Sequence, residues 1–214
     1  MRGTVTSVSS LLAGIAVFTL GNGLLGSLLS VRLAQAGVPT LIAGMVMAAY
    51  FAGLAIGSAT ANRLIVSVGH IRAFAALAAA YAAAALVHPL ALTAALWAGL
   101  RFIEGFCVAG VFMCTESWLN ERANNQTRGR IMSLYMIVLY LALGAGQFLL
   151  DADTPDGAGL FALASAAVSV SLIPVALTRM PAPPAPTSSR LGLVALYRLS
   201  PLGVVGSFAS GMIL

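Results

Sequence analysis

Two oppositely charged residues, Arg101 and Glu104, stand within an apolar stretch of the sequence. Because side chains at positions i and i+3 of a helix are neighbours, the two can form an ion pair. A charge inside an apolar environment such as a bilayer is costly, so such a residue usually faces the interior of a helix bundle and serves a function. A proton on Glu104 would break the pair and free Arg101 to bind an anion or to reorient. The alternative, which the sequence leaves open, is a permanent bridge that fixes helix packing.

Three further polar residues lie in or near apolar stretches. Asn22 and Gln147 are uncharged, and each can either contact a bound molecule or hydrogen-bond to a neighbouring helix. Glu116 follows Arg101 on the same stretch, about 22 Å further along a helix. We predict that Glu116 pairs with an arginine of the following loop, in preference to capping an inner gate.

The histidines and cysteines do not suggest a metal site. His70 and His88 flank the same apolar stretch at opposite ends, so they cannot share a metal. We expect His70 in a loop, and His88 near the outer surface as a candidate for pH sensing. The sequence contains no phosphate-binding loop and no nucleophile motif. It therefore predicts no metal, no cofactor and no enzyme.

The composition indicates a membrane protein. Hydrophobic residues make up 60% of the 214 residues and charged residues 8%, whereas soluble domains carry about 25% charged residues. Mean hydropathy is +0.98. Apolar windows of roughly 20 residues recur and match the thickness of the hydrocarbon core. We therefore predict an all-α polytopic fold with six transmembrane helices, at residues 8–31, 40–61, 71–88, 91–118, 129–150 and 158–178.

The sequence divides into three parts. Residues 1–178 are expected to form the six-helix bundle, and residues 179–200, rich in proline, a semi-rigid cytoplasmic linker. Residues 201–214 begin a seventh apolar stretch that is too short to cross a bilayer. We therefore expect further spans beyond Leu214.

The arginines predict the orientation. The net charge is +5, and the positive-inside rule is satisfied if the N-terminus lies in the cytoplasm. The arginines that then face the cytoplasm are Arg2, Arg63, Arg72, Arg122, Arg128, Arg130, Arg179, Arg190 and Arg198. Because they are dispersed among loops, they form no basic face, and we expect no nucleic-acid partner.

Two segments resemble motifs of the major facilitator superfamily. The stretch that starts at Arg101 resembles the motif RxxqGxgaa, with matches at Arg101, Gly105 and Ala109 and with Glu104 where glutamine is usual. The loop of residues 62–72 is similar to GxLaDRxGRK. Its matches are Leu64, Gly69 and the basic end Arg72, whereas Asn62 and Val66 replace the first glycine and the aspartate of the motif.

A third resemblance concerns residues 116–130. Glu121 is followed seven positions later by Arg128 and a glycine, as in the superfamily. The run from Glu116 to Arg122 resembles the YcaD-like permease branch of the superfamily. The whole chain is thus similar to the N-terminal half of such a protein plus the start of its seventh span.

The resemblance implies a fold and a function. It implies two inverted three-helix repeats, a central cavity lined by spans one, two, four and five, and alternating access. The expected function is secondary active transport of a small molecule across the bacterial inner membrane, coupled to protons, with a second six-helix half. The alternative is a truncated, transport-inactive membrane fragment. Contacts at the cytoplasmic gate or in the cytoplasmic loops would involve Leu64, Gly69, Arg72, Glu116, Glu121 and Arg128.

Overall fold

The computed structural model describes residues 2–91, 93–152, 157–177, 197–198, 200–202 and 205, with side chains from Ser9 onward. The predicted linker at 179–200 and the predicted seventh span at 201–214 lie almost entirely outside the described residues. Nearly all of the described residues belong to the six-helix part of the chain.

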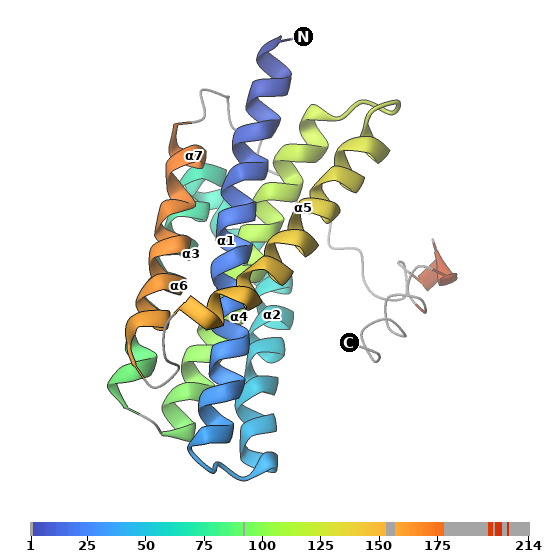
Figure 1. Ribbon diagram of the computed structural model, residues 1–214. Helices are drawn as coiled ribbons and strands as arrows, with labels where there is room; N and C mark the ends of the chain where they lie inside the picture. The colour runs from blue at the N-terminus through green and yellow to red at the C-terminus, as the bar shows by residue number, and fades with distance from the viewer. Residues whose placement is uncertain are drawn as a thin grey trace.

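The described chain is all helical, as the composition predicts (Figure 1). Six helical segments within it are long and apolar enough to cross a membrane. The helices are α1 (Arg2–Gln35), α2 (Thr40–Val68), α3 (His70–Val87), α4 (Ala94–Arg122), α5 (Arg128–Phe148), α6 (Gly159–Val170) and α7 (Leu172–Ala176). Two 3₁₀ turns, η1 (His88–Leu90) and η2 (Leu149–Ala152), extend α3 and α5. The prediction of a multi-pass helical membrane protein is confirmed.

Several helices run beyond the ends predicted from hydropathy. Helix α2 continues to Val68 and α4 to Arg122, because backbone hydrogen bonding persists through polar residues outside the hydrocarbon core. Glycines with positive φ then end two of the helices. Gly37 has φ 64° after α1, and Gly69 has φ 84° between α2 and α3.

The sixth span consists of two helical pieces, α6 and α7, that meet at Ser171. Pro174 has no N–H to bond the carbonyl oxygen of Val170, so the α-helical ladder is interrupted there. At the junction, the Ser171 hydroxyl donates to the carbonyl oxygen of Val168 at 2.6 Å. The span as a whole runs from Gly159 to Ala176.

The helix pairs follow an internal two-fold relation. The main packing pairs are α2 with α4, α1 with α5, α1 with α6, α3 with α4, and α3 with α6. Exchanging the first three spans for the last three converts α1–α5 into α4–α2 and α1–α6 into α4–α3, and leaves α3–α6 unchanged. This is the pairing expected of two inverted three-helix repeats.

Glycines allow the backbones of α2 and α4 to touch. A Cβ on Gly53 would overlap the carbonyl oxygen of Phe102, and a Cβ on Gly105 would overlap that of Tyr50. Small residues of this kind let helices pack closely in lipid, where no hydrophobic force drives them together. A second reciprocal contact of the same type joins α1 to α5, through Gly23 with Leu143 and Gly146 with Leu20.

Candidate functional site

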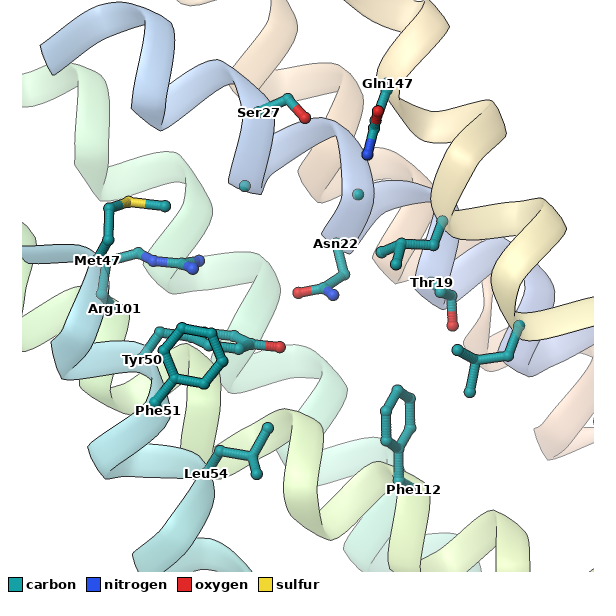
Figure 2. Close-up of a pocket in the computed structure, with 14 residues that line it drawn as sticks. Thr19, Asn22, Ser27, Met47, Tyr50, Phe51, Leu54, Arg101, Phe112 and Gln147 are labelled. Carbon is teal, nitrogen blue, oxygen red and sulfur yellow. The ribbon is translucent and has the colours of Figure 1, made fainter. Parts of the chain in front are cut away.

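A cavity of about 470 Å³ lies between α1, α2, α4 and α5. These are the four spans from which the family resemblance implies a central cavity. Figure 2 shows its lining residues, which are Thr19, Asn22, Gly23, Gly26, Ser27, Met47, Tyr50, Phe51, Leu54, Arg101, Phe112, Leu139, Leu143 and Gln147. The wall is mainly apolar and aromatic, and among these residues Arg101 has the one charged side chain.

The two uncharged polar residues singled out in the sequence, Asn22 and Gln147, both line this cavity. Asn22 extends from α1 between Arg101 and Gln147 in the view of Figure 2. Its Oδ1 accepts a hydrogen bond from the hydroxyl of Tyr81 on α3 at 2.9 Å. The sequence left open whether Asn22 contacts a bound molecule or a neighbouring helix. In the structure Asn22 bonds to a neighbouring helix and also lies on the cavity wall.

The predicted ion pair between Arg101 and Glu104 is present. Arg101 Nη1 donates to Glu104 Oε2 at 3.0 Å, and the residues are 4% and 0% exposed. The guanidinium carbon of Arg101 lies 4.2 Å from the ring centroid of Tyr50, a cation–π contact. Arg101 Nε is buried and has no hydrogen-bond partner among the described residues. Arg101 thus lies at the cavity wall, with Glu104 behind it.

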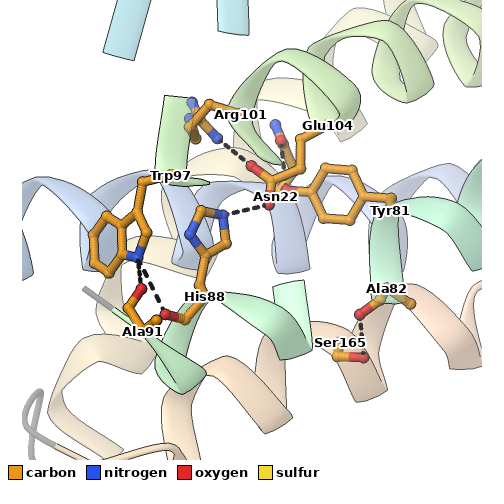
Figure 3. Close-up of polar contacts among 9 residues, drawn as sticks. All are labelled: Asn22, Tyr81, Ala82, His88, Ala91, Trp97, Arg101, Glu104 and Ser165. Carbon is orange, nitrogen blue, oxygen red and sulfur yellow. Dashed lines mark hydrogen bonds and ion pairs between the residues drawn. The ribbon is translucent and has the colours of Figure 1, made fainter. Parts of the chain in front are cut away.

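His88 completes the cluster, and the sequence did not predict this contact. His88 Nε2 lies 2.9 Å from Glu104 Oε1, so the carboxylate is held between His88 and Arg101 (Figure 3). The His88 side chain is fully buried inside the bundle, and its expected position near the outer face of the membrane stays a prediction. His88 Nδ1 is also buried and has no partner within the described part of the chain.

The turn η1 and Trp97 hold the imidazole in place. His88 is the first residue of this 3₁₀ turn, and Pro89 directly follows it. The Trp97 indole N–H lies 3.1 Å from the carbonyl oxygen of His88 and 2.9 Å from that of Ala91, and donates to both. The Trp97 ring meets the His88 imidazole edge-on, with 5.1 Å between the ring centroids. The Phe161 ring stacks on the same imidazole, with 6.0 Å between the centroids. This packing leaves the imidazole little freedom to turn away from Glu104.

The residues of the motif at 62–72, which spans the junction of α2 and α3, have distinct environments. Leu64 is half-buried and packs against the core, whereas Arg72 is exposed. Gly69 has φ 84° and ψ 161°, a conformation almost restricted to glycine, which explains glycine at this motif position. The expectation of His70 in a loop was wrong, because it is buried at the start of α3 with its ring 6.1 Å from that of Trp118.

The α4–α5 turn also differs from expectation in one contact. Glu116 accepts a hydrogen bond from the Tyr135 hydroxyl of α5 at 3.3 Å, and among the described side chains it pairs with no loop arginine. Arg128 Nε donates to Asn120 Oδ1 at 2.9 Å, and Glu121 is exposed. The predicted pairing of Glu116 was wrong because a side chain of the next helix is nearer.

Comparison with known proteins agrees with this arrangement. The profile of the family described as sugar (and other) transporter matches residues 6–152. Proteins named uncharacterized MFS-type transporter YcaD, from Salmonella heidelberg, Salmonella agona and Salmonella choleraesuis, are 29% identical over 209 residues. The match covers 97% of this chain and 55% of each relative, so the chain spans about half the length of these relatives. Because the profile match covers more than half of the chain, the protein belongs to the sugar (and other) transporter family of the major facilitator superfamily.

Proposed function

We propose that this chain forms half of a proton-coupled secondary transporter that moves a small molecule across the bacterial inner membrane by alternating access. The observation that carries the proposal is the cluster of three ionisable residues, Arg101, Glu104 and His88, beside the cavity. Ionisable residues are rare inside membrane-spanning helices and commonly mark the routes of protons or substrates.

The contacts of Glu104 suggest how a proton is taken up. In the resting cluster, His88 Nε2–H donates to Glu104 Oε1, and Nδ1 is unprotonated. A proton that arrives at Nδ1 makes an imidazolium, and the Nε2 proton then moves across the 2.9 Å contact to Glu104. The imidazole is left neutral with its proton on Nδ1. The new carboxylic acid no longer carries the charge that held Arg101, so the guanidinium can turn toward the cavity.

The ends of the helices support the proposed orientation. The N-terminus lies at the same end of the bundle as the α4–α5 turn (Figure 1), and that turn carries Arg122, Arg128 and Arg130. With this end in the cytoplasm, as the positive-inside rule requires, η1 lies near the outer face. Protons from outside would then reach His88 first.

A complementary half belongs to the proposal. Helices α2 and α5 are the least buried of the six spans, and both contribute to the cavity wall. We propose that a second six-helix half faces them and closes the cavity. Contacts at the inner gate or in the cytoplasmic loops would involve Leu64, Gly69, Arg72, Glu116, Glu121 and Arg128, which lie at or between the cytoplasmic ends of α2 to α5. The alternative is that this chain alone is a membrane fragment without transport activity. The match to 55% of the length of its relatives is the reason to test this alternative.

The test uses proteoliposomes with an imposed pH gradient and a panel of labelled compounds. Both this chain alone and the product of the complete reading frame are reconstituted. We expect the latter to show gradient-driven flux accompanied by proton movement, and Glu104→Gln to abolish gradient-driven accumulation. The matched control is Asp151→Asn, an exposed carboxyl group in η2, which should retain full flux.

Each outcome bears on a different part of the proposal. Full gradient-driven transport by Glu104→Gln would contradict the role of Glu104 and leave the permanent bridge as the explanation of the ion pair. Flux from the complete product but none from this chain would mean that the chain alone is the inactive fragment. Flux that does not depend on the pH gradient in either protein would contradict proton coupling.

A further inference from the structure

We infer that the cavity binds an amphipathic organic monoanion, and that the anion binds together with one proton. The inference rests on the proposed transport function and names its substrate class. It starts from the charges around the cavity wall and the order in which they can be neutralised.

The wall of the cavity carries its charge at one place. Arg101 is the charged residue among the described lining residues, and Glu104, fully buried behind it, does not line the cavity. One nitrogen of the guanidinium is used by Glu104, and one face rests on Tyr50. Nε has no partner among the described residues. A ligand in the cavity therefore meets the cation of Arg101, and a cationic ligand would be repelled.

The net charge of the cluster depends on a single proton. With a neutral imidazole, Arg101 and Glu104 sum to zero, and an added proton on Glu104 raises the sum to +1. The other titratable neighbours of Glu104 are the hydroxyls of Tyr50 and Tyr81 and the thiol of Cys107. Hydroxyl and thiol groups of these types are uncharged at neutral pH. The proton on the cluster therefore decides whether the wall attracts an anion.

This arithmetic links the proton to the substrate. A net charge in a low-dielectric interior is unfavourable. Two states of the cluster are therefore favoured because each has zero net charge: the state with neither proton nor anion bound, and the state with both a proton and a monoanion bound. The states with only the proton or only the anion carry net charge. Proton and anion therefore bind together, with one proton for each anion. A dianion would leave a net negative charge in the same place.

The rest of the wall suits an apolar body with few polar groups. The apolar part of the lining includes Phe51, Leu54, Phe112, Leu139 and Leu143. The amides of Asn22 and Gln147 and the hydroxyls of Thr19 and Ser27 add a small number of hydrogen-bonding groups. A sugar would leave many hydroxyls facing apolar side chains, whereas a carboxylate on an aromatic or aliphatic body matches both parts of the wall.

The test measures binding of three isosteric probes to the protein in nanodiscs of zwitterionic lipid. The probes are 4-phenylbutyrate, its neutral amide and the cationic 4-phenylbutylamine. Calorimetry in buffers of different ionisation enthalpy reports proton uptake. We expect the carboxylate to bind at least about tenfold more tightly than either other probe, with uptake of about one proton for each molecule bound.

Variants separate the roles of the two charges. Glu104→Gln mimics the protonated carboxyl group, so it should bind the carboxylate equally at acidic and alkaline pH, with no proton uptake. Arg101→Gln should lose the preference for the carboxylate, and Arg101→Lys, which keeps the charge, should retain part of it. Arg130→Gln, an exposed arginine of α5 outside the cavity, is the matched control and should behave as the unmodified protein. Thermal unfolding of each variant verifies that it is folded.

The outcomes distinguish this inference from the transport proposal. Equal binding of the carboxylate and the amide, tighter binding of the amine, or carboxylate binding without proton uptake would overturn the inference. Gradient-driven flux of neutral or cationic compounds would contradict the substrate class alone. Proton-linked carboxylate binding in a complete protein that shows no gradient-driven flux would contradict the transport proposal alone.

Discussion

Glu104 is held by donors from two separate parts of the chain, Arg101 one turn earlier on α4 and His88 at the end of α3. Desolvation of such a group is expensive, and the ion pair repays it only when all contacts are made. Replacing a whole buried pair by apolar residues is therefore often tolerated, whereas removing one partner is not. This difference gives a test of how strongly the residues are coupled.

We predict that Glu104→Ala destabilises the protein by about 3–5 kcal/mol, because Arg101 is left buried with an uncompensated charge. The double variant Arg101→Met/Glu104→Met should lose much less. Thermal unfolding in detergent, compared across the single variants Arg101→Met and Glu104→Met and the double variant, measures the coupling. Additive losses in the double variant would mean that the two side chains act independently.

We predict that His88→Asn slows gradient-driven flux by about tenfold or more, since an acid–base group on the proton route is lost. Exchange of substrate between two equally loaded sides needs no proton release and should be unaffected. Counterflow and gradient-driven uptake in proteoliposomes measure the two processes. The control is His70→Asn, a buried histidine at the other end of α3. Equal losses in both assays would indicate a structural role for His88.

The sequence predicted the part of the site that is local. Arg101 and Glu104 are three residues apart, and helix geometry alone makes them neighbours. His88 approaches Glu104 from a different span, at the start of a turn that contains Pro89 and is held by the Trp97 hydrogen bonds. Such a contact depends on how α3 and α4 pack, and no spacing in the sequence encodes that. For the same reason Tyr135 was not foreseen as the partner of Glu116.

At the scale of the elements, backbone contact between helices replaces side-chain packing at two places. Gly53 and Gly105 bring α2 against α4, and a Cβ at either position would overlap a backbone carbonyl group. A backbone carbonyl cannot move aside as a flexible side chain can. The effect of a glycine-to-alanine substitution on stability therefore depends on where the glycine lies along its helix.

We predict that Gly53→Ala destabilises the protein by about 1–3 kcal/mol through overpacking. Gly44→Ala, on the same helix with open space around its Cα, should be neutral or stabilise by up to about 1 kcal/mol through helix propensity. Unfolding in a denaturing detergent series compares the two. Equal effects at both positions would contradict the close backbone approach between α2 and α4.

Hydropathy predicted the existence of each span and misplaced several ends. It reports the thickness of the hydrocarbon core, so it does not detect the polar turn that carries α4 through Asn120 to Arg122. It also could not show the interruption at Ser171, because the chain remains apolar on both sides of it. The end of α1 and the end of α2 are each followed by a glycine with positive φ, Gly37 and Gly69 respectively. Glycine in the sequence therefore indicates these two helix ends better than hydropathy does.

At the scale of the whole molecule, basic residues gather at one end of the bundle. The α2–α3 loop region carries Arg63 and Arg72, and the α4–α5 turn carries three further arginines. The turn at the opposite end, around η2, carries the exposed Asp151. This asymmetry is the basis of the proposed orientation.

We predict that Gly129→Cys is labelled by a membrane-impermeant maleimide only after cells are opened, whereas Asp151→Cys is labelled in intact cells. The native Cys107 and Cys114 are buried, so the unmodified protein should give little background. The opposite labelling pattern would reverse the proposed orientation and place His88 at the cytoplasmic side.

The glycine contact between α2 and α4 also bears on substrate choice. The carbonyl group that Gly105 approaches belongs to Tyr50, whose ring lies beneath Arg101, and the one that Gly53 approaches belongs to Phe102, the neighbour of Arg101 in the chain. A slip of one residue between the helices would move the ring by about 1.5 Å along the axis and about 100° around it. The register between α2 and α4 therefore decides which side chain of α2 meets the guanidinium of Arg101, and with it the proposed preference for an anion.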